Sequence, residues 1–131
     1  MNAQPDPRFD QKLANFSKAL RALERSASLP VKEARDLSGI IKDFEIAYEL
    51  SWKSLKAHLE KQGHATGTAK NVFAQAYQLG DLSDENVWLE MIEDRNLTDH
   101  TYDEKLAKLL SDHIRSRYVP AFQALEKKIR G

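Results

Sequence analysis

Hydrophobic residues recur at steps of three and four along most of the chain, which is the spacing of one face of an α-helix. This spacing predicts a first helix over residues 8–27. Leu29-Pro30 should end it, because proline disfavours helical conformation in the residue before it. The inward side chains of this helix are expected to be Phe9, Leu13, Phe16, Leu20 and Leu23.

The second predicted helix is the longest and covers residues 32–62. Gly63 follows it and is a natural C-terminal cap. A polar linker then leads to a short helix over residues 68–79, which Gly80 should stop. The apolar stripe of the long helix consists of Leu37, Ile41, Phe44, Tyr48, Trp52, Leu55 and Leu59.

Two further helices are predicted in the second half of the chain. Ser83 is expected to cap the first of them, with Val87, Trp88, Met91 and Ile92 as its apolar residues. The other starts near Tyr102 and runs toward Lys128, and Pro120 should kink or divide it. Its inward side chains are expected to be Leu106, Leu109, Leu110, Ile114, Tyr118, Phe122, Leu125 and Ile129.

Four longer helices and one short helix, joined by short loops, predict an all-α protein with an up-and-down helical bundle. No segment shows the alternation of a β-strand. The length of 131 residues suits one domain, so residues 1–131 are expected to form a single bundle. The apolar stripes allow both a bundle core and a homodimer face.

Composition removes several classes of function. The chain has no cysteine, which excludes a disulfide framework, a thiolate zinc site and a cysteine nucleophile. Its 20 basic and 20 acidic side chains cancel, whereas nucleic-acid binders are usually strongly basic. Any contact with nucleic acid must therefore use a local patch or a composite site.

Targeting features are also absent from the sequence. No apolar run approaches the roughly 18 residues of a membrane span. The N-terminus, MNAQPDPRFD, lacks the apolar stretch of a signal peptide. The expected location is therefore the cytoplasm, with no membrane partner.

One polar segment, RNLTDHTYDE at residues 95–104, lies between two apolar helices. A structural interpretation is available, because Thr101 and Glu104 have the spacing of a capping box. Asp99 is an alternative cap. On this interpretation the segment only begins an ordinary helix.

A functional interpretation of the same segment rests on geometry. Arg95 falls in the last turn of one helix, His100 lies just before the next helix, and Tyr102 falls in that helix's first turn. A helix N-terminus favours anions such as phosphate, and Arg95 could fork onto the same phosphate. These parts predict a phosphate-sized site.

Such a site suits metal-independent RNA cleavage. The His100 imidazole would deprotonate a ribose 2′-hydroxyl or protonate the leaving oxygen, while Arg95 stabilises the charged phosphorane. General acid–base help of this kind contributes typically about 10² to 10⁴-fold. One histidine per chain is little for a reaction that needs both acid and base, so a homodimer that joins two segments would supply both.

The run Arg95-Asn96-Leu97-Thr98-Asp99-His100-Thr101-Tyr102 resembles the signature of HEPN-domain toxins, in which Arg, four residues, His, one residue and Tyr follow one another. Two more stretches resemble the same subgroup, historically labelled nucleotidyltransferase substrate-binding proteins. One runs from Asp43 through Trp52 to Lys56, and the other is Trp88 to Asp94. The resemblance extends from about Phe16 to Phe122.

This resemblance implies a HEPN-like homodimer and an RNase toxin of a type VII-like HEPN/MNT toxin–antitoxin module, acting on tRNA or mRNA. Arg95 and His100 would be catalytic, with Asn96 and Asp99 as supporting polar residues. The partner would be a minimal nucleotidyltransferase (MNT) antitoxin that attaches AMP to Tyr102. No metal and no cofactor are implied.

One position departs from the pattern of these relatives. They commonly have Ser-Pro-Arg at the start of the short helix, whereas this chain has Thr68-Ala69-Lys70. The positive charge is kept and the guanidinium fork is lost, so a phosphate role does not transfer directly to Lys70.

Two other functions compete with the nuclease. The same segment could recognise a nucleotide or substrate for a separately encoded transferase, as the non-catalytic subunit of a two-component nucleotidyltransferase. The chain could also be a purely structural interaction module.

Several residues outside the segment have two interpretations. Glu45 and Glu49 form either a solvated shoulder or a contact with the site or partner. Trp52 and Trp88 are expected in the core, whereas Tyr48 could lie in the core or line the cleft. His58, His64 and His113 belong to no recognisable constellation. Basic residues near the end of the last helix either complement its dipole or contact RNA: Arg115, Arg117, Lys127, Lys128 and Arg130.

Overall fold

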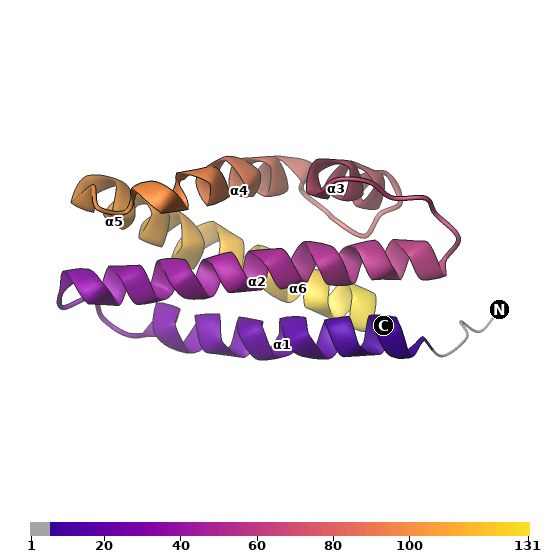
Figure 1. The fold of residues 1–131 in the computed structure, drawn as a ribbon, viewed down its shortest axis with the longest axis horizontal. Helices are drawn as coiled ribbons and strands as arrows, with labels where there is room; N and C mark the ends of the chain where they lie inside the picture. Colours follow the sequence, from indigo (N-terminus) through magenta and orange to yellow (C-terminus); the bar gives the residue numbers. More distant parts are fainter. Residues whose placement is uncertain (1–5) are drawn as a thin grey trace.

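Two long antiparallel helices lie side by side in the computed structural model, which describes residues 6–131 (Figure 1). α1 spans Pro7–Ser28 and α2 spans Ala34–Lys61. The Asp6 carboxylate caps α1 by accepting the N–H groups of Arg8 and Phe9 at 3.0 and 3.2 Å. α1 ends at Ser28 and Leu29 is already extended, so the predicted stop at Leu29-Pro30 is confirmed.

Gly63 closes α2 as predicted. Its φ of +92° lies in the left-handed region, which residues with a Cβ rarely adopt. The N–H of Gly63 donates to the Glu60 carbonyl at 3.0 Å, and that of His64 donates to the Leu59 carbonyl at 3.1 Å. The last carbonyls of α2 are therefore satisfied by the turn itself.

The second half of the chain consists of shorter helices in close succession. The Thr68 side chain caps α3. α4 leads directly into a short 3₁₀ turn. The last helices form one continuous helical stretch, residues 104–130, called the final rod below, and it contains a π-helical segment. The bounds are α3 Ala69–Gln78, α4 Glu85–Leu97, the 3₁₀ turn η1 Thr98–His100, α5 Glu104–His113, the π segment η2 Ile114–Tyr118 and α6 Val119–Arg130.

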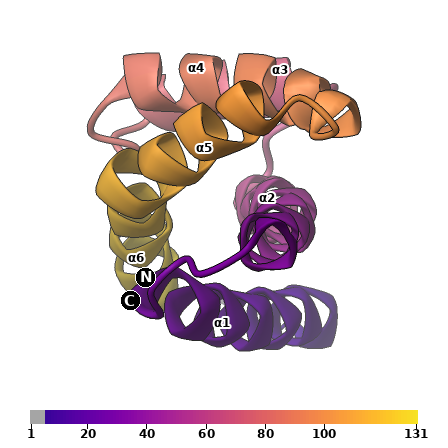
Figure 2. The ribbon, with the colours of Figure 1, turned by 90° about the vertical axis from the view of Figure 1, so that its left-hand side faces the viewer.

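α2 lies between the other elements. Figures 1 and 2 show α1 on one side of it, with α3, α4 and α5 on the opposite side and α6 between the two. α5 packs on α2, and α6 packs mainly on α1. With α5, η2 and α6 counted as one rod, residues 6–131 form four longer helices and one short helix, which confirms the predicted all-α bundle.

Aromatic side chains from six elements fill the centre of the bundle. Phe44 of α2 stacks on Tyr118 of η2 with ring centroids 5.4 Å apart, and Trp88 of α4 meets Phe73 of α3 at 4.8 Å. Phe122 of α6 contacts Trp88 at 5.7 Å and so links both groups. The aromatic cluster, with Phe16 from α1, makes the two halves of the chain one core.

The π segment lies directly before Pro120. The Val119 N–H donates to the Ile114 carbonyl, five residues back. Proline has no N–H, and its ring meets the carbonyl four residues back in a regular α-helix, so a wider turn accommodates it. The interruption predicted at Pro120 is therefore this π turn, and the rod continues to Arg130.

Three details of the sequence prediction need correction. Leu109 was expected inside but is 51% exposed. Trp52 is only partly buried, because its indole N–H donates to Glu49 at 3.2 Å rather than entering the core. Ser83 was expected to cap α4, but the cap is Asp84, whose carboxylate accepts the N–H groups of Asn86 and Val87.

Among residues 6–131, no helix is both long and apolar enough to cross a bilayer. The sequence predicted that the N-terminus is not a signal peptide. The first five residues of that segment, Met1 to Pro5, lie outside the described residues.

The change of cap has a measurable consequence. Asp84→Ala should lower the free energy of unfolding by about 1 kcal/mol, because two N–H groups lose their acceptor. Ser83→Ala is the matched control and should change it by less than about 0.5 kcal/mol. Urea unfolding of both variants measures the difference, and a larger loss for Ser83→Ala would contradict the assignment.

His58 joins α2 to the turn before α4. Its imidazole is buried, with Nε2 3.5 Å from the Asp81 carboxylate and with no hydrogen-bond partner for Nδ1. Burial lowers the pKa of His58, although the Asp81 charge acts in the opposite direction. The folded protein therefore favours the neutral imidazole.

This shift predicts a pH dependence of stability. Below the unfolded histidine pKa of about 6.5, the unfolded chain binds a proton more readily than the folded one, so stability is lost as pH falls. His58→Gln should reduce the loss of unfolding free energy between pH 7 and pH 5. Equal losses in the variant and the wild type, measured by urea unfolding at both pH values, would contradict it.

Candidate functional site

Arg95 occupies the last turn of α4, as predicted. Its Nη1 donates to the Thr98 hydroxyl at 3.1 Å, and this hydroxyl donates to the Arg95 carbonyl at 2.8 Å. Thr98 is buried. The first residue of the 3₁₀ turn therefore holds one side of the guanidinium.

Glu49 of α2 approaches the other side of this guanidinium. The Arg95 Nε lies 3.7 Å from Glu49 Oε1, an ion-pair distance too long for a hydrogen bond. The buried Nε has no hydrogen-bond partner. Trp52 donates to the second carboxylate oxygen of Glu49 at 3.2 Å. Of the two interpretations left open by the sequence, Glu49 thus contacts the candidate site.

Tyr48 lies beside the same charges. It is buried, and burial together with the Glu49 charge raises the pKa of its phenol to about 12, while Arg95 acts in the opposite direction. Tyr48 therefore remains protonated at neutral pH. Its side chain belongs to the core, where its ring lies 6.1 Å from that of Phe73.

His100, the last residue of the 3₁₀ turn, and Tyr102 form an exposed pair. His100 Nδ1 lies 3.3 Å from the Tyr102 hydroxyl, and the two rings are nearly perpendicular, at 78°. Tyr102 is 84% exposed. Both an imidazole and a phenol hydroxyl are therefore open to a ligand from solvent.

The helix after this pair begins later than predicted. α5 starts at Glu104, and its cap is Asp103, whose carboxylate accepts the N–H groups of Lys105 and Leu106 at 3.0 and 3.2 Å. The prediction that Tyr102 lies in the first helical turn is therefore wrong. Capping by Thr101 or Asp99 is wrong as well. A carboxylate already occupies the helix N-terminus where phosphate was expected.

The remaining predicted residues are less connected. Asn96 and Asp99 are exposed, and neither side chain makes a hydrogen bond within residues 6–131. Arg95 is bound by Thr98 and Glu49, whereas His100 contacts Tyr102. No described contact joins Arg95 to His100, so their convergence on one phosphate stays a prediction.

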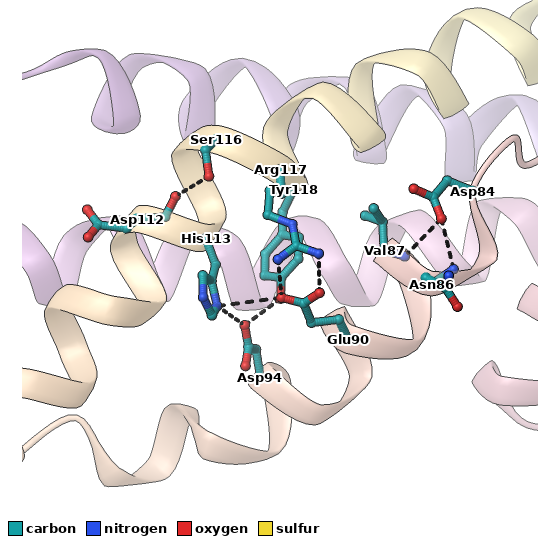
Figure 3. Close-up of polar contacts among 10 residues, drawn as sticks. All are labelled: Asp84, Asn86, Val87, Glu90, Asp94, Asp112, His113, Ser116, Arg117 and Tyr118. Atoms are coloured by element: carbon teal, nitrogen blue, oxygen red, sulfur yellow. Dashed lines mark hydrogen bonds and ion pairs between the residues drawn. The ribbon is translucent and has the colours of Figure 1, made fainter.

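A second polar cluster, which the sequence did not suggest, joins α4 to the final rod (Figure 3). Asp94 accepts a hydrogen bond from the Tyr118 hydroxyl and lies 2.7 Å from His113 Nδ1. Glu90, one turn earlier, accepts both terminal nitrogens of Arg117. Burial and the bond to Asp94 raise the pKa of Tyr118, so it acts as a donor.

This cluster also contains the only three side chains among the described residues that could together hold a metal ion. One ligand atom each of Glu90, Asp94 and His113 lies within 4.8 Å of the others. A cation there would compete with the Arg117 guanidinium for Glu90 and with the Tyr118 hydroxyl for Asp94. The donors present suit a self-contained polar network better than a metal centre.

Most basic residues near the end of the final rod bind other residues of the same chain. Arg115 donates to the Leu29 carbonyl at 2.9 Å, Arg117 binds Glu90, and Arg130 binds Ser17 at 2.6 Å. Lys127 and Lys128 are exposed. The three arginines therefore fasten the final rod to other elements.

A helical bundle with a polar turn between its last two helical segments, and an arginine ahead of an exposed histidine–tyrosine pair, defines a recognisable class of protein. The chain belongs to the family described as nucleotidyltransferase substrate binding protein like, whose sequence profile matches residues 11–131. The resemblance inferred from the sequence is thereby confirmed.

One individual protein is similar to part of this chain. A probable ribonuclease HepT of Haemophilus influenzae is 33% identical over 76 residues, which are 54% of this chain and 52% of that protein. The matched stretch thus spans about half the length of this relative.

Two solved structures share the fold. A protein of Thermus thermophilus is 33% identical, with a TM-score of 0.74 over 88% of this chain and 96% of its own. A Haemophilus influenzae protein, described as having the fold of a substrate binding domain of a nucleotidyltransferase, is 25% identical. Its TM-score is 0.81 over 91% of this chain and 99% of its own.

The four tyrosines differ enough in exposure to be distinguished chemically. Tetranitromethane nitrates ionised phenols that it can reach from solvent. Tyr102, which is 84% exposed, should therefore be modified first, and Tyr77, which is 45% exposed, second. Tyr48 and Tyr118 should resist because burial raises their pKa. Peptide mass spectrometry after limited nitration measures the order, and early nitration of Tyr48 or Tyr118 would contradict the geometry.

Proposed function

We propose that this chain is the toxin of a type VII-like HEPN/MNT module, a metal-independent endoribonuclease that acts on RNA. The observation that carries the proposal is the exposed pair of His100 Nδ1 and Tyr102 hydroxyl, 3.3 Å apart and just downstream of Arg95. The similarity to a probable ribonuclease supports the same activity.

The proposed reaction is an internal transesterification. The neutral His100 imidazole removes the proton of a ribose 2′-hydroxyl, and the 2′-oxygen forms a bond to phosphorus. The bond from phosphorus to the 5′-oxygen breaks, and an imidazolium returns a proton to that oxygen. The products are a 2′,3′-cyclic phosphate and a 5′-hydroxyl.

Arg95 stabilises the negative charge that develops on the phosphorane oxygens. Because Asp103 occupies the N-terminus of α5, this stabilisation falls to the guanidinium rather than to helix N–H groups. A homodimer brings two Arg95–His100 segments to one cleft, so that one imidazole serves as base and the other as acid. Asn96 and Asp99 are exposed polar residues beside this cleft.

Control by a minimal nucleotidyltransferase follows from the same pair. The Tyr102 oxygen attacks the α-phosphorus of ATP, loses its proton, and releases pyrophosphate. The attached AMP places a phosphodiester at the oxygen that now lies 3.3 Å from His100. It therefore occupies the space that an RNA phosphate would need.

Induced expression of the chain alone tests the proposal. Growth should stop with the wild type and continue with His100→Ala or Arg95→Ala. His64→Ala, in the linker before α3, is the matched control and should remain toxic. Purified wild type should cleave RNA in EDTA, with rates about 10² to 10⁴-fold above those of His100→Ala.

A second function is favoured by the description of the Haemophilus structure as a substrate binding domain. In this case the chain binds a nucleotide or substrate for a separate nucleotidyltransferase and performs no chemistry. A harmless wild-type chain that cleaves no RNA, yet binds such a transferase, would favour this role. Continued silencing of Tyr102→Phe by the transferase activity would refute control through Tyr102.

A further inference from the structure

The inward face of α4 is apolar only in its first part. Trp88 and Met91 are buried there, and Val87 and Ile92 pack partly against the core. Only Trp88, Met91 and Asp94 are buried, at successive steps of three. At the C-terminal end of α4, the inward position is thus occupied by a carboxylate, and its hydrogen bonds hold that end of the helix against its neighbours.

The partners of Asp94 come from one place on the final rod. Asp94 is 7% exposed, and Tyr118, which binds it, is fully buried. His113 binds the same oxygen at 2.7 Å. Glu90 and Arg117 add a second link one turn away. The network therefore fixes α4 against η2 at two successive turns.

The π turn explains how two residues five apart reach one carboxylate. In an α-helix, His113 and Tyr118 would be separated by about 140° around the axis. In the π segment, which closes between residues i and i+5, they return to the same side. Their rings lie 6.2 Å apart at 70°. The turn before Pro120 thereby assembles the two partners of Asp94.

Arg95 is the next residue of α4 and the first of the candidate site. A roll of α4 that separated Asp94 from Tyr118 would also carry Arg95 away from Glu49. The buried Arg95 Nε lies 3.7 Å from that carboxylate without a hydrogen bond, so a small displacement changes its environment.

We propose that Asp94, held by Tyr118 and His113, is a positioning residue that sets the place of the Arg95 guanidinium. The catalytic part of this inference rests on the proposed ribonuclease function. The structural part concerns Arg95 itself and does not require RNA cleavage.

Tyr118→Phe is the most informative variant, because it removes the hydroxyl and keeps the ring that stacks on Phe44. Tyr77→Phe, on the exposed surface of α3, is the matched control. His113→Gln provides a second test should Tyr118→Phe fail to fold. The first measurement is the ¹⁵N–¹H signal of the Arg95 Nε, assigned by its absence in Arg95→Lys.

Tyr118→Phe and His113→Gln should shift or broaden the Arg95 Nε signal, and Tyr77→Phe should leave it unchanged. An unchanged Arg95 signal in folded Tyr118→Phe and His113→Gln would overturn the proposal. This arm decides the structural part even if the wild type cleaves no RNA, in which case only the proposed ribonuclease function fails.

In an active wild type, Tyr118→Phe should lower kcat about 10- to 100-fold with little change in KM, as a misplaced catalytic group does. In an Arg95→Ala background it should lower kcat no further, because the residue through which it acts is already lost. An equal loss in both backgrounds would show a general structural effect and would overturn the positioning role.

Discussion

A buried carboxylate is unfavourable in a helical bundle unless donors surround it. Asp94 meets this condition through the hydroxyl of Tyr118 and the imidazole of His113. Both donors belong to the final rod, and moving α4 away from it would leave the buried charge without partners. This requirement holds α4 against the final rod. Arg95 and the turn that carries His100 and Tyr102 follow directly in the chain. The candidate site thus begins one residue after a carboxylate that two side chains of the last helical stretch hold in place.

Arg95 is held less completely than Asp94. Its Nη1 donates a hydrogen bond to Thr98. Its Nε faces Glu49 at ion-pair distance only, so the Nε hydrogen has no acceptor. Glu49 balances the guanidinium charge across an ion pair that is long and partly open to solvent. An incoming phosphate would therefore compete with one loosely paired carboxylate rather than with a closed salt bridge. Such an arrangement keeps an arginine in place before its ligand arrives.

The sequence was sufficient to predict the helices, because the spacing of apolar residues and the helix-ending glycines and prolines are local signals. It predicted Arg95 in the last turn of α4 and the cap at Gly63. It placed the start of α5 too early, since Thr101, Asp99 and Asp103 are all good caps and only the chain's path selects Asp103. Leu109 was misassigned because the helical period alone does not show which side of α5 faces α2.

The two polar clusters could not be derived in the same way. Glu49 and Arg95 are far apart in sequence, and the partner of an isolated glutamate cannot be read from its neighbours. His113 and Tyr118 do not share a face in a regular α-helix, so the period that found the helices conceals this pair. Only Pro120 hinted that the regular period would fail there.

The π turn also holds one residue more than a regular α-turn. Deleting one residue between His113 and Tyr118 would convert it to an α-turn, in which a residue and the fourth residue after it lie on nearly the same side. The apolar side chains of α6 would then keep their orientation toward α1. A deletion within α6 itself has no such turn to absorb it, so every later side chain would rotate by about 100°.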